Sequence, residues 1–147
     1  MMTIMRDILL VEDNRQDEML ILRALRKVNI ANRIDVVRDG QQALDYLFRE
    51  GEFAEREGTD LPSVVLLDIG LPRLSGLEVL ERLRADQRTN LLPVVILTSS
   101  DEERDRLHSY ENGANSFVRK PLDFSEFAET VARLGIYWLA TNLPPQG

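Results

Sequence analysis

Four short apolar runs in this chain each end in polar residues whose types could carry out metal and phosphorus chemistry. The polar ends are Glu12-Asp13, Asp68, Thr98 and Arg119-Lys120-Pro121, and the runs before them are residues 8–11, 64–67, 94–97 and 117–118. Ligands of an open parallel α/β sheet bind outside the carboxyl ends of its strands. We therefore expect carboxylates, a hydroxyl and an ammonium group to lie close together at one edge of the sheet.

Asp68 is the candidate nucleophile, because it follows four aliphatic residues that would hold it at a strand end. Phosphoryl transfer depends on positioning and charge neutralisation, so an attacking carboxylate needs a metal ion and fixed donors beside it. Mg²⁺ prefers an octahedral shell of oxygens and keeps several waters. We expect Glu12, Asp13, Asp68 and the backbone carbonyl of Gly70 to provide that shell.

Lys120 and Thr98 complete the predicted site. Lys120 would pair as a point charge with one phosphoryl oxygen, and the Thr98 hydroxyl would donate to another. An isolated Glu-Asp pair or Lys-Pro pair usually belongs to a solvated loop. Because all four strand ends match in this chain order, a functional site is the favoured interpretation.

The elements that must position these residues alternate between short aliphatic runs and longer segments of helical period, which favours βα repeats and a parallel sheet. We expect strands at residues 7–12, 33–37, 64–68, 94–98 and 116–119, and helices at residues 15–29, 40–49, 76–84, 101–112 and 124–139. Each helix begins with a capping signal. The caps with their partners are Asn14 with Asp17, Asp39 with Gln42, Ser75 with Glu78, Ser100 with Glu103, and Asp123 with Glu126.

The last helix carries an apolar stripe, which predicts core packing from Phe124 to Leu134. For Trp138 two interpretations stay open, packing on its own domain or contact with another subunit. We interpret residues 50–62 as a solvated loop. Residues 142–145 cannot continue a helix and should end the last one. We expect a single domain over residues 1–147, with a core at about 6–140 and a tail at 141–147.

Composition excludes several classes of protein. The chain has 147 residues and no cysteine, which suits one domain without disulfides or zinc–thiolate sites. Its net charge of -7 disfavours binding to nucleic acid. No run reaches the ~20 apolar residues of a membrane span, and the first residues lack the features of a signal peptide. We therefore expect a cytoplasmic protein that binds neither nucleic acid nor membrane.

These residues together resemble the CheY-like receiver domains of two-component response regulators. The resemblance rests on Glu12-Asp13, the segment 66–72 with Gly76 behind it, Thr98 and Lys120-Pro121, and it covers nearly the whole chain. It implies a flavodoxin-like (βα)5 three-layer sandwich with strand order 2-1-3-4-5, Mg²⁺ as cofactor, and Asp68 as the acceptor of a phosphoryl group from a sensor histidine kinase. It implies no enzyme beyond self-catalysed phosphotransfer and autodephosphorylation.

The resemblance also implies a switch. The Thr98 hydroxyl would move toward the phosphate and Phe117 would turn inward, although Phe117 is equally consistent with a plain core residue. It further implies a cis Lys120–Pro121 bond. Gly70 and Ser100 stand at two positions that often govern phosphate loss in the family. Neither offers an acid or amide to orient water, so we hypothesise slow autodephosphorylation.

The end of the chain resembles that of small regulators paired with bacterial phytochrome kinases. This implies a red-light context and a homodimer through the fourth helix, fifth strand, fifth helix and tail, with Tyr137, Trp138 and Leu139 in the interface.

Two alternatives remain open. One is an interaction module that never carries phosphate. The other is a haloacid dehalogenase-type phosphohydrolase, which would need a second acid where Gly70 stands. His108 is interpreted as a surface or packing residue.

Overall fold

A parallel sheet lies at the centre of the molecule. The computed structural model describes residues 6–29, 31–56, 61–99, 102–143 and 145. Its strands are β1 (Arg6–Val11), β2 (Ala31–Val37), β3 (Val64–Leu67), β4 (Val94–Thr98) and β5 (Ser116–Arg119). They pair in parallel in the order β2-β1-β3-β4-β5. The predicted flavodoxin-like topology is therefore confirmed, and the carboxyl ends of all these strands lie at one edge.

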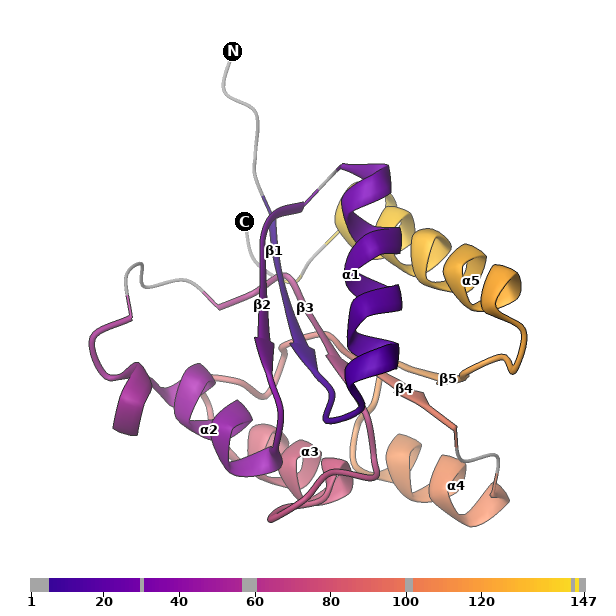
Figure 1. Ribbon diagram of the computed structural model, residues 1–147. Coiled ribbons are helices and arrows are strands. Elements are labelled where there is room, and N and C mark those ends of the chain that lie inside the picture. The colour runs from indigo at the N-terminus through magenta and orange to yellow at the C-terminus, as the bar shows by residue number, and fades with distance from the viewer. Residues whose placement is uncertain (1–5, 30, 57–60, 100–101, 144, 146–147) are drawn as a thin grey trace.

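Helices cover both faces of this sheet (Figure 1). They are α1 (Arg15–Val28), α2 (Gly40–Phe48), α3 (Gly76–Ala85), α4 (Glu103–Glu111) and α5 (Phe124–Ile136), with a 3-10 turn at Gly51–Phe53 and a π-helical turn at Tyr137–Thr141. α1 and α5 lie side by side on one face, and α2 and α3 pack together on the other, with α4 next to α3. The fold has three layers.

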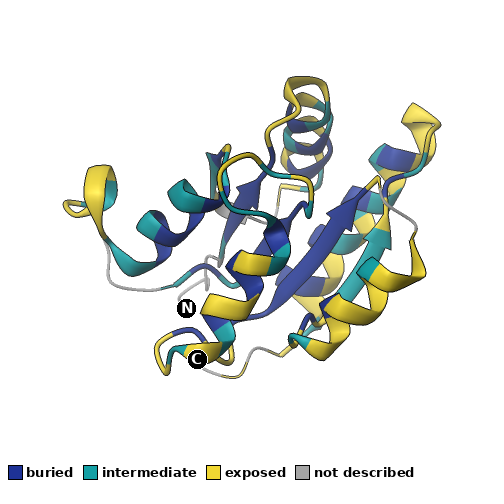
Figure 2. Cartoon of the chain, turned by 90° about the horizontal axis from the view of Figure 1, so that it is seen from below, coloured by how far each residue is buried: buried dark blue, intermediate teal, exposed yellow. Residues whose placement is uncertain are grey.

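The strand sequences explain these layers. Along β1, Ile8 and Leu10 belong to the apolar cluster under α1 and α5, and Leu9 and Val11 belong to the cluster under α2 and α3. Alternate residues of a strand point to opposite faces. β3 and β4 are buried along their whole length, as central parallel strands covered on both sides should be (Figure 2).

Side-chain caps begin most of the helices as predicted. Asn14, Asp39, Ser75 and Asp123 each accept a hydrogen bond from the backbone N–H three residues on. The fourth helix differs, because its N-cap is Glu102, which makes no capping bond with its side chain. Ser100 lies outside the described residues.

The C-terminal apolar stripe follows the helical period only in part. Phe127 and Val131 are buried, but Phe124 is 68% exposed, so its predicted place in the core is wrong. Phe124 is the first residue of α5 and does not belong to the cluster under α1 and α5. Beyond α5, the π-helical turn carries Trp138 and Leu139 into the cluster under α1 and α5.

The fold overturns one further expectation. The Lys120–Pro121 bond is trans, because no cis peptide bond occurs among the described residues, and the cis prediction is wrong. The trans form of an X-Pro bond is preferred by about 0.5–1 kcal/mol unless packing selects the other. Within the described part of the chain, no helix combines the length and apolarity that crossing a membrane requires.

Candidate functional site

A cavity of about 630 Å³ opens at the carboxyl edge of the sheet. Its walls come from the ends of β1, β3 and β4, from the residue that follows β5, and from the first turns of α1 and α4. The lining residues are Asp13, Asn14, Asp17, Asp68, Ile69, Gly70, Thr98, Ser99, Glu102, Asp105 and Lys120. The structure thus brings together the predicted strand-end residues Asp13, Asp68, Thr98 and Lys120, with Gly70 beside them.

Asp68 has both carboxylate oxygens held in place. Oδ1 accepts the Thr98 hydroxyl at 2.8 Å and the Gly70 N–H at 3.1 Å, and Oδ2 accepts the Lys120 ammonium at 2.9 Å. Burial alone would raise the pKa of Asp68, but the charge and hydrogen bond of Lys120 and the hydrogen bonds from Thr98 and Gly70 hold this pKa below its ordinary value. The carboxylate is therefore ionised and oriented at neutral pH.

The loop after Asp68 is shaped by a close backbone approach at Gly76. The Gly76 N–H donates to the Ile69 carbonyl at 2.9 Å. A Cβ at Gly76 would lie 2.1 Å from the carbonyl oxygen of Asp68, which no side chain can accommodate. The glycine in the sequence motif is therefore needed to bring the start of α3 against the residue that carries the site.

Three carboxylates converge next to Asp68. Oxygen atoms of Glu12, Asp13 and Asp68 lie within 4.8 Å of one another. Glu12 is 1% exposed, and burial raises its pKa to about 7 although Lys120 opposes the shift. Asp13 is exposed on the rim. An all-oxygen set of this kind fits a hard divalent cation such as Mg²⁺.

Lys120 lies behind these carboxylates and is 6% exposed. Its Nζ donates to Glu12 Oε1 at 2.5 Å, to Asp17 Oδ2 at 2.8 Å and to Asp68 Oδ2 at 2.9 Å. Burial would lower the pKa of the ammonium, but these three hydrogen bonds raise it above its ordinary value. Its backbone N–H donates to the Thr98 carbonyl at 2.7 Å, which ties the end of β5 to the end of β4.

Asp17 is the member of this network that sequence reasoning missed as a site residue. It was interpreted only as the residue capped by Asn14. Its contact with Lys120 joins positions 103 residues apart along the chain. The available signal was a third acid, four residues after Asp13 and so about one helical turn beyond the Glu12-Asp13 pair.

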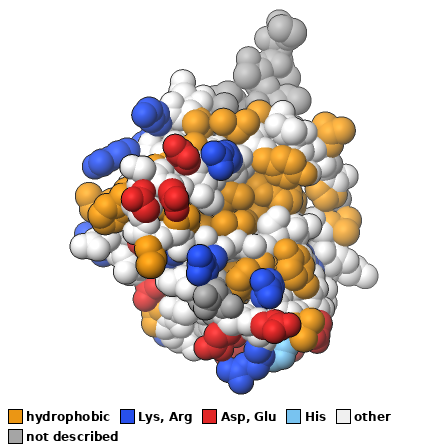
Figure 3. Space-filling view, turned by 90° about the vertical axis from the view of Figure 1, so that its right-hand side faces the viewer, with side chains coloured by type: hydrophobic (Ala, Val, Ile, Leu, Met, Phe, Trp, Pro, Cys, Tyr) orange, Lys and Arg blue, Asp and Glu red, His pale blue; other side chains and the backbone are white. Residues whose placement is uncertain are grey.

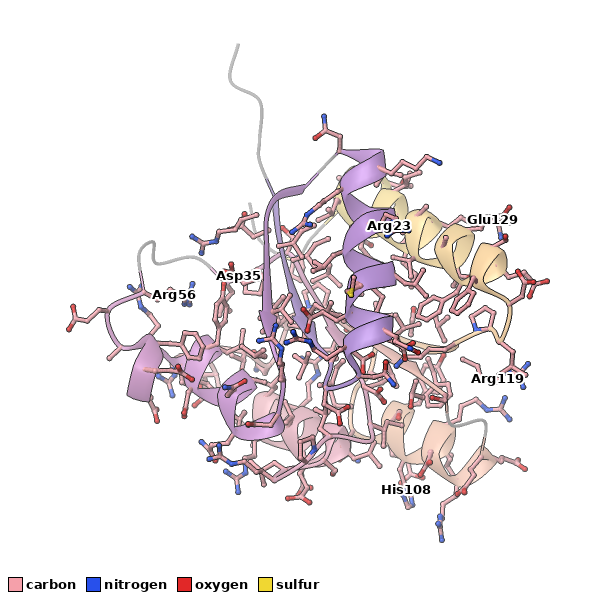
Figure 4. The ribbon with its side chains drawn as sticks, in the orientation of Figure 1. Arg23, Asp35, Arg56, His108, Arg119 and Glu129 are labelled. Carbon is pink, nitrogen blue, oxygen red and sulfur yellow. The ribbon has the colours of Figure 1, made fainter. Side chains whose placement is uncertain are left out.

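The remaining predicted residues lie away from the pocket. Phe117 is half-buried against the cluster under α2 and α3, and its neighbour on β4 is Ile96. Of the predicted interface residues, Trp138 and Leu139 are buried in their own domain at 8% and 5% exposed, while Tyr137 is 49% exposed. His108 is an exposed residue of α4 (Figure 4).

The match to a known family agrees with this geometry. Residues 8–132 match the response regulator receiver domain family. The chain belongs to this family. A receiver domain is a signalling module of two-component phosphorelays, and Asp68 lies at the carboxyl edge of the sheet, where open α/β folds in general bind their ligands.

Several relatives cover nearly the whole receiver domain. The probable methanogenesis regulatory protein FilR2 of Methanothrix harundinacea is 43% identical over 138 residues, which are 94% of this chain and 86% of FilR2. The response regulator Rcp1 of Synechocystis is 34% identical over 138 residues, which are 94% of this chain and 92% of Rcp1.

Solved structures extend the likeness to three dimensions. The phosphorylated cyanobacterial phytochrome response regulator RcpA has a TM-score of 0.91 at 36% identity, covering 97% of this chain and 100% of RcpA. Rcp1 in its Mn²⁺-bound form has a TM-score of 0.88 at 32% identity, and the match covers 95% of this chain and 99% of Rcp1.

Proposed function

We propose that this receiver domain takes a phosphoryl group onto Asp68 from a phosphohistidine of a sensor kinase. The observation that carries the proposal is the pair of fixed oxygens on Asp68, held by Thr98, Gly70 and Lys120 beside two further carboxylates. An ionised carboxylate with a fixed direction is what in-line attack on phosphorus requires.

In the proposed step an oxygen of Asp68 forms a bond to phosphorus while the bond from phosphorus to the histidine nitrogen breaks. The imidazole keeps that electron pair and takes a proton from solvent. The Thr98 hydroxyl and the Lys120 ammonium, which now donate to Asp68, would donate to phosphoryl oxygens in the transition state. Such preorganised donors stabilise charge without having to reorient.

We further propose that Mg²⁺ binds to Glu12, Asp13, Asp68 and the backbone carbonyl of Gly70. When bound, the ion would neutralise charge on the transferring group. The converging oxygens of Glu12, Asp13 and Asp68 support this site. Calorimetric titration with Mg²⁺ should show Asp13→Asn weakening the affinity by at least about tenfold, with Asp86→Asn as control, because Asp86 pairs with Arg88 and does not line the pocket. Equal affinity in the Asp13 variant would exclude Asp13 as a ligand.

Intact mass after incubation with Mg²⁺ and acetyl phosphate tests the acceptor. Wild type should gain one phosphoryl group, Asp86→Asn should gain it too, and Asp68→Asn should not. An adduct that persists in Asp68→Asn would refute the acceptor. Absence of any adduct in wild type would favour a phosphorylation-independent interaction module, and catalytic turnover of a phosphorylated small molecule would favour a phosphohydrolase.

The proposed output is contact with a second copy of the chain through α4, β5, α5 and the turn after α5. Figure 3 shows apolar side chains gathered over this side of the molecule. Its exposed apolar residues are Leu107, Tyr110, Leu122, Phe124, Ile136 and Tyr137. Contiguous apolar surface of this kind marks interfaces. Phosphorylation would bias the surface through Thr98 and Phe117.

Size-exclusion chromatography with light scattering, with and without beryllofluoride, tests the dimer and its dependence on phosphorylation. Tyr137→Ala should weaken a dimer, and the exposed Met19→Ala on α1 is the control. A dimer that Tyr137→Ala leaves unchanged would remove Tyr137 from the interface.

We propose that this chain acts in the cytoplasm and that its phosphodonor is a sensor histidine kinase of the phytochrome type. RcpA is named as a cyanobacterial phytochrome response regulator, which supports this source, whereas FilR2 is named as a probable methanogenesis regulatory protein. The phosphodonor can be identified by comparing the rate of phosphotransfer from a purified bacteriophytochrome kinase with the rate from a kinase without a chromophore. A faster transfer from the second kinase would overturn the phytochrome assignment.

The lifetime of the phosphorylated state is a separate proposal. Gly70 offers no side chain to orient water, and Ser100 offers no acid or amide, so we expect slow loss of phosphate. Removal of excess acetyl phosphate followed by timed mass measurement tests this. Gly70→Asn should shorten the lifetime, and a wild-type phosphoprotein that decays as fast as this variant would contradict slow loss.

A further inference from the structure

Lys120 has a third carboxylate partner, Asp17, that belongs to neither the acidic pair nor the acceptor. Asp17 Oδ2 accepts from Lys120 Nζ at 2.8 Å, and the side chains are 23% and 5% exposed. The same ammonium donates to Glu12 and Asp68. An ammonium group has three N–H donors. All three are therefore directed at carboxylates before any phosphoryl group arrives.

The start of α1 places Asp17 at this ammonium. Asn14 caps the helix by accepting the Asp17 N–H at 2.9 Å, which fixes the first turn. Side chains of an α-helix tilt toward its N-terminus, so the Asp17 carboxylate reaches back to the carboxyl edge of the sheet. The next residue, Glu18, instead accepts both Nε and Nη2 of Arg38 at 3.0 Å. The two neighbouring acids thus have separate partners.

The geometry points to Asp17 as a positioning residue for phosphoryl transfer, an inference that rests on the proposed function of Asp68. Glu12 and Asp17 together hold two of the three N–H groups of Lys120. The third is then presented to Asp68 Oδ2, and it can pass to a phosphoryl oxygen without moving the ammonium. Asp17 acts through Lys120 and does not touch the phosphoryl group.

A purely structural explanation would be that Asp17 only complements the positive N-terminal end of the helix dipole. The chain offers a matched control for that effect. Glu126 follows its N-cap Asp123 by three residues at the start of α5, and its N–H is capped in the same way at 3.0 Å. Glu126 is exposed, whereas Asp17 reaches the buried Lys120. Glu126→Ala removes a first-turn acid without touching the ammonium.

Initial rates of phosphorylation by acetyl phosphate at saturating Mg²⁺ test the inference. Asp17→Ala should lower the maximal rate about tenfold with little change in the KM for acetyl phosphate, because misplacing one donor weakens the transition state more than binding. Asp17→Asn, which keeps the acceptor oxygen, should recover part of the rate. Glu126→Ala should match wild type.

Two further measurements separate positioning from a structural effect. In a Lys120→Ala background, Asp17→Ala should cause no additional loss, because the residue it positions is gone. The 15N–1H signal of the Lys120 ammonium should be protected from exchange in wild type and in Glu126→Ala and lose that protection in Asp17→Ala.

The inference fails if the Asp17→Ala protein is phosphorylated at the wild-type rate. It also fails if Asp17→Ala lowers the rate of phosphorylation by the same factor in the Lys120→Ala background as in wild type. It also fails if the ammonium signal is unaffected by Asp17→Ala. Absence of phosphorylation on Asp68 in wild type would instead refute the proposed function. The ammonium signal is recorded without a phosphodonor, so it still tests the contact with Asp17 in that event.

Discussion

α4 and α5 lie against opposite faces of the sheet near β5, and they are held there very differently. α5 and the turn after it bury Phe127, Val131, Trp138 and Leu139 in the cluster shared with α1. Among the described residues of α4, Ser109 alone is buried, and its hydroxyl donates to the Asp105 carbonyl within the same helix. α5 is anchored by apolar burial, and α4 is not.

This difference indicates which helix can respond to chemistry at Asp68. α4 begins next to the pocket, and its N-cap Glu102 and its residue Asp105 line the pocket. A weakly buried helix opens at low free energy, whereas a helix with several buried side chains opens only with the core. We therefore expect changes at Thr98 to spread through α4 while α5 keeps its place on α1.

The largest expected effect concerns the anchor of α5. Trp138→Ala should lower the free energy of unfolding by about 3–5 kcal/mol, because it removes a large buried side chain and leaves a cavity. Urea unfolding followed by far-UV circular dichroism measures this. A loss below about 0.5 kcal/mol, the range of ordinary surface changes, would break the comparison.

Hydrogen exchange compares the two helices directly. Amides in the middle of α4 should exchange at least about tenfold faster than those in the middle of α5, a difference of about 1.4 kcal/mol in opening free energy. Beryllofluoride should change protection in α4 more than in α5. Equal protection of both helices in the free protein would contradict the assignment of α4 as the responsive element.

The two acids at the start of α4 that line the pocket, the N-cap Glu102 and Asp105, allow a sharper test. The double variant Glu102→Gln/Asp105→Asn should accelerate phosphorylation by acetyl phosphate up to about fivefold at low salt, because two negative charges no longer repel the donor. The acceleration should fade at high salt. Glu103→Gln/Glu111→Gln changes the same charge on α4 outside the residues that line the pocket and should have less effect.

The smallest expected effect completes the comparison. Leu107 on α4 is 56% exposed, and Leu107→Ala should change the free energy of unfolding by no more than about 0.5 kcal/mol. The urea experiment used for Trp138→Ala measures it. A loss of 2 kcal/mol or more, about the lower limit for a buried leucine, would show that α4 is anchored after all.

The sequence predicted the fold and most of the pocket because both follow from local patterns. Aliphatic runs mark the central strands, and polar residues directly after them must meet at one edge of a parallel sheet. The bounds of β4 and β5 agree with prediction, and four of the predicted caps form.

What the sequence did not predict depends on contacts between distant segments. The pairing of Asp17 with Lys120 spans 103 residues, and only its place four residues after Asp13 sets Asp17 apart from an ordinary first-turn acid. An apolar stripe of helical period likewise does not show at which residue the face of the helix stops being buried. Phe124 therefore proved exposed, and Trp138 proved buried in its own domain.

The burial of Trp138 also equips the molecule with an optical probe. It is the single tryptophan of the chain, and it lies in the cluster under α1 and α5, away from α4. Its emission should stay blue-shifted as long as α5 remains seated on α1. Fluorescence can therefore report unfolding while remaining silent to rearrangements of α4, so that the two kinds of motion become separable in one cuvette.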